Sequence, residues 1–427
     1  MQPNIPETEQ KRVVIVGAGF GGLALARKLS GKKEVQVVLI DKNNYHQFQP
    51  LFYQVATAGL EPSAISFPLR KIFHKKENVH IRVTEVTSIN TNENQITTGI
   101  GTIGYDYLVL ALGADTNFFG LKNIIANAIP MKSVSEALGL RNRLLQNFED
   151  ALASSSEEEK EGYMNIVIVG GGPTGTEISG TLAEMRRTVL PKDFPELDFA
   201  KMKIYLVEHS PKVLGPMSEQ ASRKAKIYLE NLGVTVMVAS EVKDFDGKQV
   251  FLGDGTIIKS NILVWTAGIK SNFVEGLPVE VYARAGRIKV DRYNKVEGCS
   301  NVYAVGDLAL MVEEKYPNGH PQTAQPAIQQ GELLAKNLLK DIRHQGKIPF
   351  LYKDLGSMAT IGRNLAVVDL PYWKFQGFFA WLVWMLVHLM AILGVKNRLI
   401  IFINWCWSYI TFDQSLRLII KPKIKKQ

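Results

Sequence analysis

The sequence predicts an α/β fold in which two Rossmann-like domains are nested and a C-terminal helical segment follows them. Three observations predict this arrangement. A β-branched strand pattern runs directly into a glycine-rich turn and a helical pattern near residue 17, and the same pattern recurs near residue 170. The apolar stretch GFFAWLVWMLVHLMAILGV then occupies residues 377–395. The 427 residues are enough for two or three domains with well-filled cores.

Composition narrows the classes of function before any motif is considered. Cys299 and Cys406 form no closely spaced pair, so a disulfide framework, a cysteine-rich zinc site and a redox-active dithiol lack their residues. Residues 372–427 hold eight basic side chains against Asp413, so this stretch carries +7 of the net charge of +9. The small charge of the remaining body argues against a nucleic-acid partner. The N-terminus resembles neither a signal nor a transit peptide, so the body is expected to fold in the cytoplasm.

The first glycine-rich turn, in KRVVIVGAGFGGLALARKL, has the spacing of a dinucleotide-binding fingerprint. Gly17 permits the tight turn, Gly19 lets a pyrophosphate approach the backbone, and Gly22 lets helix and strand pack closely. The strand VQVVLIDKN ends in Asp41, where an acid accepts hydrogen bonds from a ribose. We therefore predict a dinucleotide with its phosphates at the N-terminus of the following helix. The alternative is a glycine-rich structural turn.

The second turn, in MNIVIVGGGPTGTEISGTLAEM, repeats the pattern with Gly170, Gly172 and Gly175. The strand MKIYLVEHS places Glu208 at the ribose position. A carboxylate there accepts from a 2′-hydroxyl and repels a 2′-phosphate, so NAD(H) is expected over NADP(H). The segment RRTVLPKDFPELDFAK, which widens the spacing to Glu208, is interpreted as an insertion. Two sites favour a bound flavin and a transient nicotinamide, because the protein alone has no group that carries a hydride.

This layout resembles the flavoproteins with two dinucleotide-binding domains, in which an NAD domain interrupts an FAD domain. The stretch GCSNVYAVGDLA ends a strand at a Gly-Asp pair, and the resemblance implies that Asp307 holds the ribityl chain or pyrophosphate of FAD. YDYLVLALGADTN, which contains Gly113, resembles the short strand that returns to the FAD domain. LVWTAGIK, which contains Gly268, resembles its counterpart beside NAD.

The expected domain boundaries follow from this layout. Residues 1–125 and 286–345 form the FAD-binding domain in two parts, 126–163 a helical connector, 164–285 the NAD(H)-binding domain, and 346–427 the C-terminal region with membrane-associating helices. Within the connector, SSSEEEKEG is expected to be a solvated loop in which Ser156 caps a short acidic turn.

Within that superfamily the sequence is similar to the type II, non-proton-pumping NADH:quinone oxidoreductases over nearly the whole chain. NYHQFQPLFYQVATAGL, which includes Gln49, resembles their segment over the isoalloxazine ring. PQTAQPAIQQG resembles their AQxAxQ quinone-site motif on Ala324, Gln325, Ala327 and Gln329, and KNRLIIFINWCWSYITFD resembles their tail. The resemblance implies hydride transfer from NADH to bound FAD, followed by two-electron reduction of a membrane quinone without proton pumping.

Two other functions remain open on the sequence alone. One is a membrane-tethered flavoprotein NAD(P)H reductase for a soluble electron carrier, and the other is a low-turnover flavin/NAD redox sensor. Sulfide:quinone oxidoreductases and disulfide reductases need a cysteine pair near the flavin, which this chain lacks. No histidine cluster has the spacing of metal ligands, so no metal is expected.

Three polar side chains are candidates for catalysis, and each has a structural alternative. Gln325 and Gln329 share one face if their segment is helical, and a neutral amide can donate to a quinone carbonyl. The alternative is that they cap or line the start of the helix. Glu177 is either an acid favoured by the helix dipole or, as the resemblance implies, a proton relay near flavin, nicotinamide and quinone.

The apolar tail raises the question of a membrane span. Phe378 to Val395 would form about 27 Å of helix, close to the thickness of the hydrocarbon core. One crossing would place the basic tail outside, against the positive-inside tendency, and a return crossing through Leu399 to Phe412 would be short. Two helices in one leaflet are favoured, with spanning as the alternative. Their tryptophans would lie at the headgroups and their basic residues on anionic lipid. We expect a homodimer on the cytoplasmic face of the cell membrane.

Overall fold

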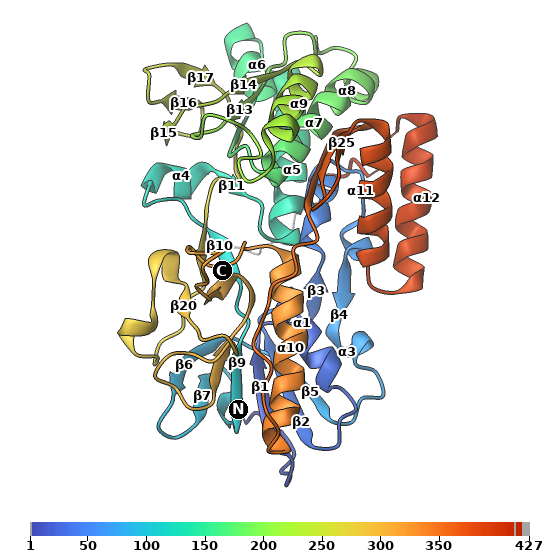
Figure 1. The fold of residues 1–427 in the computed structure, drawn as a ribbon. Helices are drawn as coiled ribbons and strands as arrows, with labels where there is room; N and C mark the ends of the chain where they lie inside the picture. The colour runs from blue at the N-terminus through green and yellow to red at the C-terminus, as the bar shows by residue number, and fades with distance from the viewer. Residues whose placement is uncertain (1, 414–415, 421–427) are drawn as a thin grey trace. The chain divides into compact units, whose positions relative to one another are not determined.

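The computed structural model describes residues 2–413 and 416–420 of the chain (Figure 1). The chain divides into two compact units. Unit 1 comprises residues 1–47, 67–115 and 269–354, and unit 2 comprises residues 48–66, 116–268 and 355–427. The two units are defined by contacts between residues and not by the ligand that each would bind. The five domain ranges expected from the sequence therefore stay a prediction.

A five-stranded parallel sheet forms the centre of unit 1, in the order β21-β9-β1-β2-β5. Its strands are β1 (Lys11–Val16), β2 (Val35–Asp41), β5 (Val79–Val83), β9 (Tyr107–Leu110) and β21 (Val302–Ala304). The runs of β-branched and aliphatic residues in β1, β2 and β9 are buried, as expected for parallel strands covered on both faces. Helix α1 (Phe20–Leu29) follows β1, and helix α10 (Ala324–Ile342) lies beside it (Figure 1).

The sheet of unit 2 has the same architecture, in the order β11-β18-β12-β13-β14. Its strands are β11 (Ile129–Pro130), β12 (Ile166–Val169), β13 (Ile204–Val207), β14 (Val234–Met237) and β18 (Leu263–Trp265). In both sheets, the strand before the glycine turn lies between the strand that leads to the acid and the strand that precedes Gly113 or Gly268. The structure therefore confirms two nested Rossmann-like domains.

Helices flank the sheet of unit 2 and also form most of residues 126–163, the range expected to be a helical connector. They are α4 (Lys122–Asn127), α5 (Val134–Ala153), α6 (Glu157–Met164), α7 (Pro173–Thr188), α8 (Leu190–Asp193) and α9 (Glu219–Asn231). Ser156 caps α6 as expected, because its hydroxyl accepts from the Glu159 backbone N–H at 3.3 Å, although the acidic segment forms a helix and not a loop. The segment interpreted as an insertion contains α8 and delays the start of β13.

The remaining elements are short and complete the two units. The helices are α2 (Phe52–Ala56) and α3 (Leu69–Ile72). The strands are β3 (Tyr45–Gln47), β4 (Ser66–Pro68), β6 (Val86–Asn90), β7 (Gln95–Thr98), β8 (Gly101–Gly104), β10 (Ala114–Thr116), β15 (Val242–Phe245), β16 (Gln249–Leu252), β17 (Ile257–Lys259), β19 (Ile269–Ser271), β20 (Ile288–Lys289) and β22 (Ala309–Leu310).

The C-terminal part of unit 2 is an antiparallel sheet followed by a helical hairpin. Its strands are β23 (Ser357–Gly362), β24 (Leu365–Asp369) and β25 (Lys374–Gln376), and its helices are α11 (Phe378–Ala391) and α12 (Val395–Thr411). Gly180 lets α7 approach β23, since a Cβ there would lie 1.6 Å from the Ile361 carbonyl oxygen. The expected helix from Phe378 to Val395 is shorter than predicted, because it ends at Ala391, the backbone is extended at Ile392, and α12 begins after Gly394, which has a φ of 79°. Among the described residues, no helix combines the length and apolarity that crossing a bilayer requires.

Candidate active site

The first glycine turn joins β1 to α1 and is closed on two sides by backbone. Gly17 has a φ of +104°, and a Cβ on it would lie 2.2 Å from the Ala111 carbonyl oxygen. A Cβ on Gly22 would lie 1.9 Å from the Gly17 carbonyl oxygen. Nothing lies within 4 Å of a Cβ on Gly19. Gly17 and Gly22 are thus required, because a side chain at either position would meet the backbone. The space beside Gly19, at the N-terminus of α1, is open, and a pyrophosphate fits there.

Asp41 fixes this turn from the end of β2. One carboxylate oxygen accepts from the Ala18 backbone N–H and the other from the Asn43 backbone N–H, both at 2.7 Å. Burial raises the pKa of Asp41 above its ordinary value, and the two hydrogen bonds oppose that shift. The buried His46 ring places Nδ1 2.8 Å from the Ala18 carbonyl oxygen. Asp41 therefore holds the turn through both of its carboxylate oxygens, and its contact with a ribose stays a prediction.

The Gly306–Asp307 turn, which follows β21, is held by residues of α10 and of the segment before it. The buried Gln330 accepts from the Gly306 backbone N–H at 2.7 Å. Gln322 Nε2 donates to the Asp307 carbonyl oxygen at 2.8 Å. Neither Gln322 nor Gln330 belongs to the site predicted from the sequence. Helical spacing could have identified Gln330, because it shares the buried face of α10 with Ala327, Gly331 and Leu334.

Gln325 and Gln329 both lie in the first two turns of α10, but their amides differ. Gln329 Nε2 donates to the Lys353 carbonyl oxygen at 2.9 Å, and its Oε1 accepts from the Lys353 N–H at 3.0 Å. No hydrogen bond joins the Gln325 amide to a residue that the structure describes. The hydrogen bonds of Gln329 thus fit the alternative of a structural role, and the part of either glutamine in quinone binding stays a prediction.

The second glycine turn, between β12 and α7, repeats the geometry of the first. Gly170 has a φ of +102°, and a Cβ on Gly175 would lie 1.9 Å from the Gly170 carbonyl oxygen. Nothing lies within 4 Å of a Cβ on Gly172. Glu208 Oε2 accepts from the Gly171 backbone N–H at 2.5 Å, and Oε1 accepts from the Ser210 N–H at 2.6 Å. Unit 2 therefore contains a second turn that fits a dinucleotide phosphate, with a carboxylate beside it.

Three further predicted residues lie outside these hydrogen-bond networks. Gly113 and Gly268 occupy equivalent places in the two units and have φ values of +67° and +76°. A Cβ on Gly268 would meet the Phe119 ring at 2.6 Å, whereas one on Gly113 would meet nothing within 4 Å. Gln49 begins the short 3-10 helix η1 (Gln49–Leu51), and its side chain is exposed.

Glu177 lies in the interior of unit 2, in the second turn of α7. It is 7% exposed, and burial raises its pKa well above the ordinary value. The Thr360 backbone N–H and the Trp384 indole N–H approach the carboxyl and oppose the shift, although the indole lies outside ordinary hydrogen-bond geometry. The helix dipole would favour the ionised form, so burial outweighs it. Glu177 can therefore hold a proton at a pH where an exposed glutamate is ionised.

Helix α11 forms one wall around Glu177. Trp384 is 2% exposed, lies 6.3 Å from the Tyr53 ring and stacks on His388 at 4.1 Å between ring centroids. The expectation that the tail tryptophans lie at lipid headgroups is therefore wrong for Trp384. A signal in the sequence was the four-residue spacing of Ala380, Trp384 and His388, which places them on one face of the helix.

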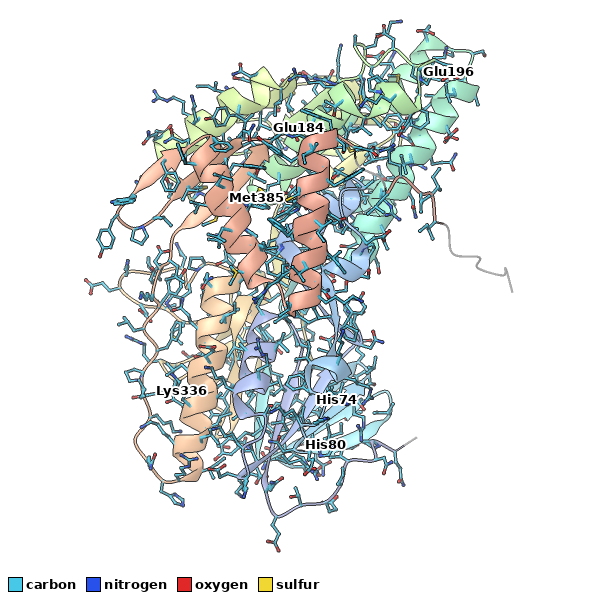
Figure 2. All side chains as sticks on the ribbon, turned by 90° about the vertical axis from the view of Figure 1, so that its right-hand side faces the viewer. His74, His80, Glu184, Glu196, Lys336 and Met385 are labelled. Atoms are coloured by element: carbon cyan, nitrogen blue, oxygen red, sulfur yellow. The ribbon has the colours of Figure 1, made fainter. Side chains whose placement is uncertain are left out.

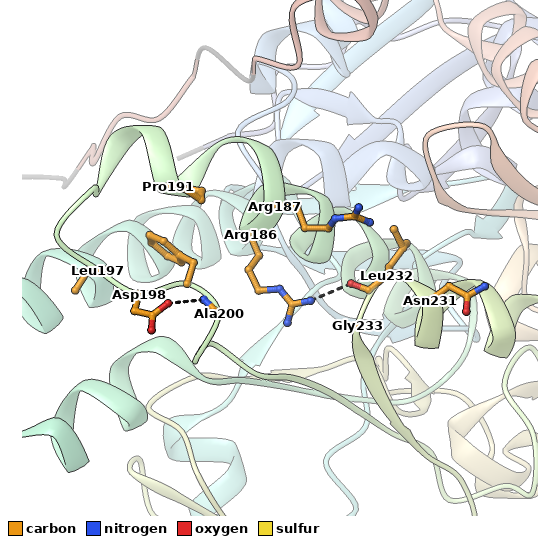
Figure 3. A pocket seen from close by; sticks show the side chains of 10 residues that line it. Arg186, Arg187, Pro191, Leu197, Asp198, Ala200, Asn231, Leu232 and Gly233 are labelled. Atoms are coloured by element: carbon orange, nitrogen blue, oxygen red, sulfur yellow. Dashed lines mark hydrogen bonds between the residues drawn. The ribbon is translucent and has the colours of Figure 1, made fainter.

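A separate hollow of about 740 Å³ lies at the opposite end of α7 from the glycine turn (Figure 3). It is lined by Arg186, Arg187, Pro191, Leu197, Asp198, Phe199, Ala200, Asn231, Leu232 and Gly233. Arg186 donates to the carbonyl oxygens of Met202 and Leu232 at 3.0 Å and 2.9 Å. The Arg186 guanidinium thus caps the C-terminal end of α9, because Leu232 is its C-cap residue. Because the glycine turn is at the other end of α7, this hollow is not the dinucleotide position.

Comparisons with known proteins agree with this geometry. Residues 11–331 match the family model of the pyridine nucleotide-disulphide oxidoreductases, and residues 355–411 match that of the NDH2 C-terminal domain. The chain is 34% identical to the type II NADH:quinone oxidoreductase Ndh of Mycobacterium tuberculosis, over 96% of this chain and 90% of that protein. It is 30% identical to the type II NADH:quinone oxidoreductase of Staphylococcus aureus, over 83% of this chain and 89% of that protein.

A solved structure shares the whole fold. NDH2 from Plasmodium falciparum, determined in complex with NADH, superposes with a TM-score of 0.87 over 97% of this chain and 100% of that chain, at 23% identity. With two dinucleotide turns, a matching C-terminal domain and relatives of this identity, the chain belongs to the type II NADH:quinone oxidoreductase family.

Proposed function

We propose that this protein oxidises NADH through bound FAD and reduces a membrane quinone by two electrons without pumping protons. The observation that carries the proposal is the repeated turn, open at its second glycine and fixed by Asp41 in one unit and Glu208 in the other. Membership of the family supports the choice of NADH and quinone as substrates. Bound FAD supplies the group that accepts a hydride and releases electrons, which no side chain can do.

The two turns would divide the work of binding. Gly17, Gly19, Gly22 and Asp41 would hold the pyrophosphate and ribose of FAD, while Asp307 would hold its ribityl or pyrophosphate oxygens. The second turn would hold NADH in the same way, at the N-terminus of α7. Glu208 would accept hydrogen bonds from the ribose hydroxyls of NADH and repel the 2′-phosphate of NADPH.

Gln325 is the residue proposed to contact quinone. Its amide can donate a hydrogen bond to a quinone carbonyl before and after reduction without a change of charge. Gln329 and Gln330 are bonded to the Lys353 backbone and to Gly306, and would hold the start of α10 in place. These hydrogen bonds would fix the part of α10 that follows Gln325, and so would hold the Gln325 side chain in one place.

Glu177 is proposed to relay a proton. Reduction of a quinone to a hydroquinone consumes two electrons and two protons. A carboxyl that stays protonated above the ordinary glutamate range can give up one proton and regain it from water. His388 is the ionisable side chain of α11, and burial lowers its pKa.

The outer faces of α11 and α12 are proposed to lie in one leaflet on the cytoplasmic side of the membrane. Figure 2 shows these helices from the side on which Met385 is labelled. Their exposed apolar residues include Phe379, Leu386, Met390, Ile403, Trp407 and Ile410. Arg417 differs from the expected role of a basic residue on anionic lipid, because it forms ion pairs with Asp193 and Asp413. The lysine cluster of residues 421–426 lies outside the described residues. A homodimer stays part of the proposal.

An anaerobic stopped-flow experiment tests the function. The FAD-loaded, detergent-purified protein is mixed first with NADH and then with a short-chain quinone, while the visible flavin absorbance is followed. Fast bleaching by NADH and fast recovery with quinone are expected. Bleaching without recovery would contradict the quinone assignment, and absence of bleaching would contradict the NADH assignment.

A further inference from the structure

The loop of residues 311–323 joins β22 to the start of α10, and Arg287 holds both of its ends. Arg287 lies directly before β20 in unit 1 and is 8% exposed. Its Nη2 donates to the Ala309 carbonyl oxygen at 2.5 Å, just before the loop begins. Near the end of the loop, Nη1 donates to the Asn318 carbonyl oxygen at 3.1 Å, and Nη2 donates to that of His320 at 3.3 Å. One guanidinium therefore closes the loop.

Gly319 lies between the two carbonyl groups that accept from Arg287 at the end of the loop. Its φ is +79°, in the left-handed region that favours glycine. A Cβ on Gly319 would lie 2.9 Å from Arg287 Nη1 and 2.6 Å from Leu310 Cδ1. A side chain at this position would therefore push the guanidinium away from its acceptors. The glycine and the arginine depend on each other.

The same loop leads to the turn at Gly306 and Asp307. Gln322, which follows the Arg287 contact, donates from Nε2 to the Asp307 carbonyl oxygen at 2.8 Å. On the other side, Gln330 accepts from the Gly306 N–H at 2.7 Å. Gln325 lies between these two glutamines in the chain, in the first turn of α10. The end of the loop and the buried face of α10 therefore both hold the segment of Gln325 against this turn.

The charge of Arg287 makes its place specific to a guanidinium. Burial lowers the pKa of Arg287, and the charge of Asp307 opposes that shift. A buried cation persists where hydrogen bonds and an opposite charge compensate it, and the loop supplies two of the three carbonyl acceptors. A lysine would keep the charge, but its single nitrogen cannot reproduce the planar fork that reaches all three. The loop conformation and the buried charge therefore stabilise each other.

We propose that Arg287 is a positioning residue for quinone reduction, because it closes the 311–323 loop and so fixes Gln325 where its amide meets a quinone carbonyl. The inference rests on the proposed function. Arg287 would act through the loop, and a small displacement of an orienting group is enough to weaken its contact with a substrate. Loss of the three hydrogen bonds should therefore impair the reaction with quinone and leave hydride transfer from NADH unchanged.

Arg287→Met is the direct test, because it removes the donors and the charge and keeps a long side chain. We expect the quinone concentration that half-saturates flavin reoxidation to rise about fivefold, the effect of one net hydrogen bond between Gln325 and quinone. Flavin reduction by NADH should keep its wild-type rate. Arg287→Lys should give a smaller rise in the same direction, since an ammonium keeps the charge and reaches some of the carbonyl oxygens.

Gly319→Ala tests the same contact from the side of the loop. It should also raise the half-saturating quinone concentration, and the double variant with Arg287→Met should add little to the effect of either change. Gly298→Ala is the matched control in unit 1. Gly298 has a φ of +72°, so the backbone strain is similar, but nothing lies within 4 Å of its Cβ. This variant should lower the Tm and leave the half-saturating quinone concentration unchanged.

Arg82→Met is the matched control for the arginine. The Arg82 guanidinium also donates to three carbonyl oxygens in unit 1, those of Pro3, Asn4 and Ile81. The segment that it holds contains none of the predicted or proposed site residues. Its replacement should therefore lower the Tm, as loss of Arg287 does, without changing the half-saturating quinone concentration.

The experiment follows both half-reactions of the FAD-loaded full-length protein by stopped flow, over a series of concentrations of a short-chain quinone. The Tm of each variant is measured beside them. If Arg287→Met does not retain FAD, the milder variants Arg287→Lys and Gly319→Ala decide the question. A wild-type half-saturating concentration in these variants, or an equal rise in Arg82→Met or Gly298→Ala, would overturn the inference. Failure of quinone to reoxidise the wild-type flavin would instead overturn the proposed function.

Discussion

Asp41 and Glu208 perform the same structural task in the two glycine turns. Each carboxylate accepts from the backbone N–H of the residue that follows the first glycine, Ala18 in one turn and Gly171 in the other. Each also accepts from an N–H two residues after itself. The acid proposed to select the ribose therefore also holds the turn proposed to bind the phosphate, so a substitution should keep one acceptor oxygen.

Glu208→Gln keeps that oxygen and removes the charge. We expect the NADH-over-NADPH ratio of kcat/KM to fall about tenfold, or about 1.4 kcal/mol, because a 2′-phosphate is no longer repelled. Steady-state rates with both nucleotides measure the ratio. Asp41→Asn makes the matched change in the first turn, and it should weaken FAD retention without changing the ratio. An unaltered ratio in Glu208→Gln would remove the role of this residue in selectivity.

Burial of Glu177 has a consequence for stability. Its pKa is raised in the folded protein above the ordinary value of 4.5, so the folded state binds more protons than the unfolded state. The free energy of unfolding must then fall as pH rises from the ordinary pKa toward the raised one, with a slope of about 1.4 kcal/mol per pH unit.

Glu177→Gln should lack this dependence. We expect its Tm to exceed that of wild type by a margin that is larger at pH 8 than at pH 5, since the neutral amide has no charge to bury. Thermal unfolding at both values checks the sign. Glu184→Gln is a comparison on the same helix: burial raises the pKa of Glu184 too, but the Arg363 backbone N–H opposes that shift, so we expect the same sign with a smaller margin. A margin that shrinks with pH in Glu177→Gln would contradict the burial argument.

At the scale of elements, α10 connects the segment proposed to contact quinone with the Gly306–Asp307 turn proposed to hold FAD. Its buried face fixes the Gly306 turn through Gln330 and packs on α1 through Gly331. Gln329, on another face, is bonded to the Lys353 backbone. Gln325 lies near the start of this helix, which is held at several points. A residue that orients a substrate requires such a rigid support.

The contact between α10 and α1 depends on a glycine. A Cβ on Gly331 would lie 2.3 Å from the Gly21 carbonyl oxygen. We expect Gly331→Ala to destabilise the protein by about 1–3 kcal/mol and to reduce FAD retention, because the helices must move apart. Gly139→Ala is the control within a helix: nothing lies within 4 Å of its Cβ, so stability should rise by up to about 1 kcal/mol. Chemical unfolding of both variants measures the difference.

At the scale of the whole molecule, α11 and α12 have two roles that a deletion cannot separate. Their inner residues pack near Glu177 and bond to Gln54, while their outer residues are apolar and exposed. Removal of the tail from Tyr372 onward would therefore disturb the interior of unit 2, and not merely release an anchor. Substitution of outer residues alone is the appropriate test of membrane binding.

A triple serine variant of the outer face should lose affinity for vesicles. The substituted residues are Leu386, Ile403 and Ile410. Binding to vesicles that contain anionic lipid should fall at least about a hundredfold, because each buried aliphatic side chain contributes about 1.5–3 kcal/mol. Reduction of a water-soluble dye by NADH should persist. Vesicle flotation measures binding.

The control substitutes three similarly exposed apolar residues of unit 1. They are Val279, Val312 and Leu351. Their replacement by serine should leave vesicle binding unchanged. An equal loss in the two triple variants would show that general surface apolarity, and not the helical hairpin, determines binding.

The sequence by itself determined the two nested domains, the positions of both glycine turns and the acids beside them. These features follow from local backbone geometry: a strand, a tight turn and a helix are specified by residues close together in the chain. The family motifs also located Gln325 and Glu177. The sequence alone did not predict which other residues surround each side chain.

Only the tertiary structure decided that environment. It showed that Gln329 bonds to Lys353, that Glu177 is buried against Trp384, and that Trp405 is bonded to Gln54. These contacts join segments far apart in the chain. In a stretch as uniformly apolar as α11, hydrophobic periodicity gives little contrast between the face that meets protein and the face that meets solvent or lipid. Burial of a particular side chain is a property of the packed molecule, because it depends on which distant surface covers it.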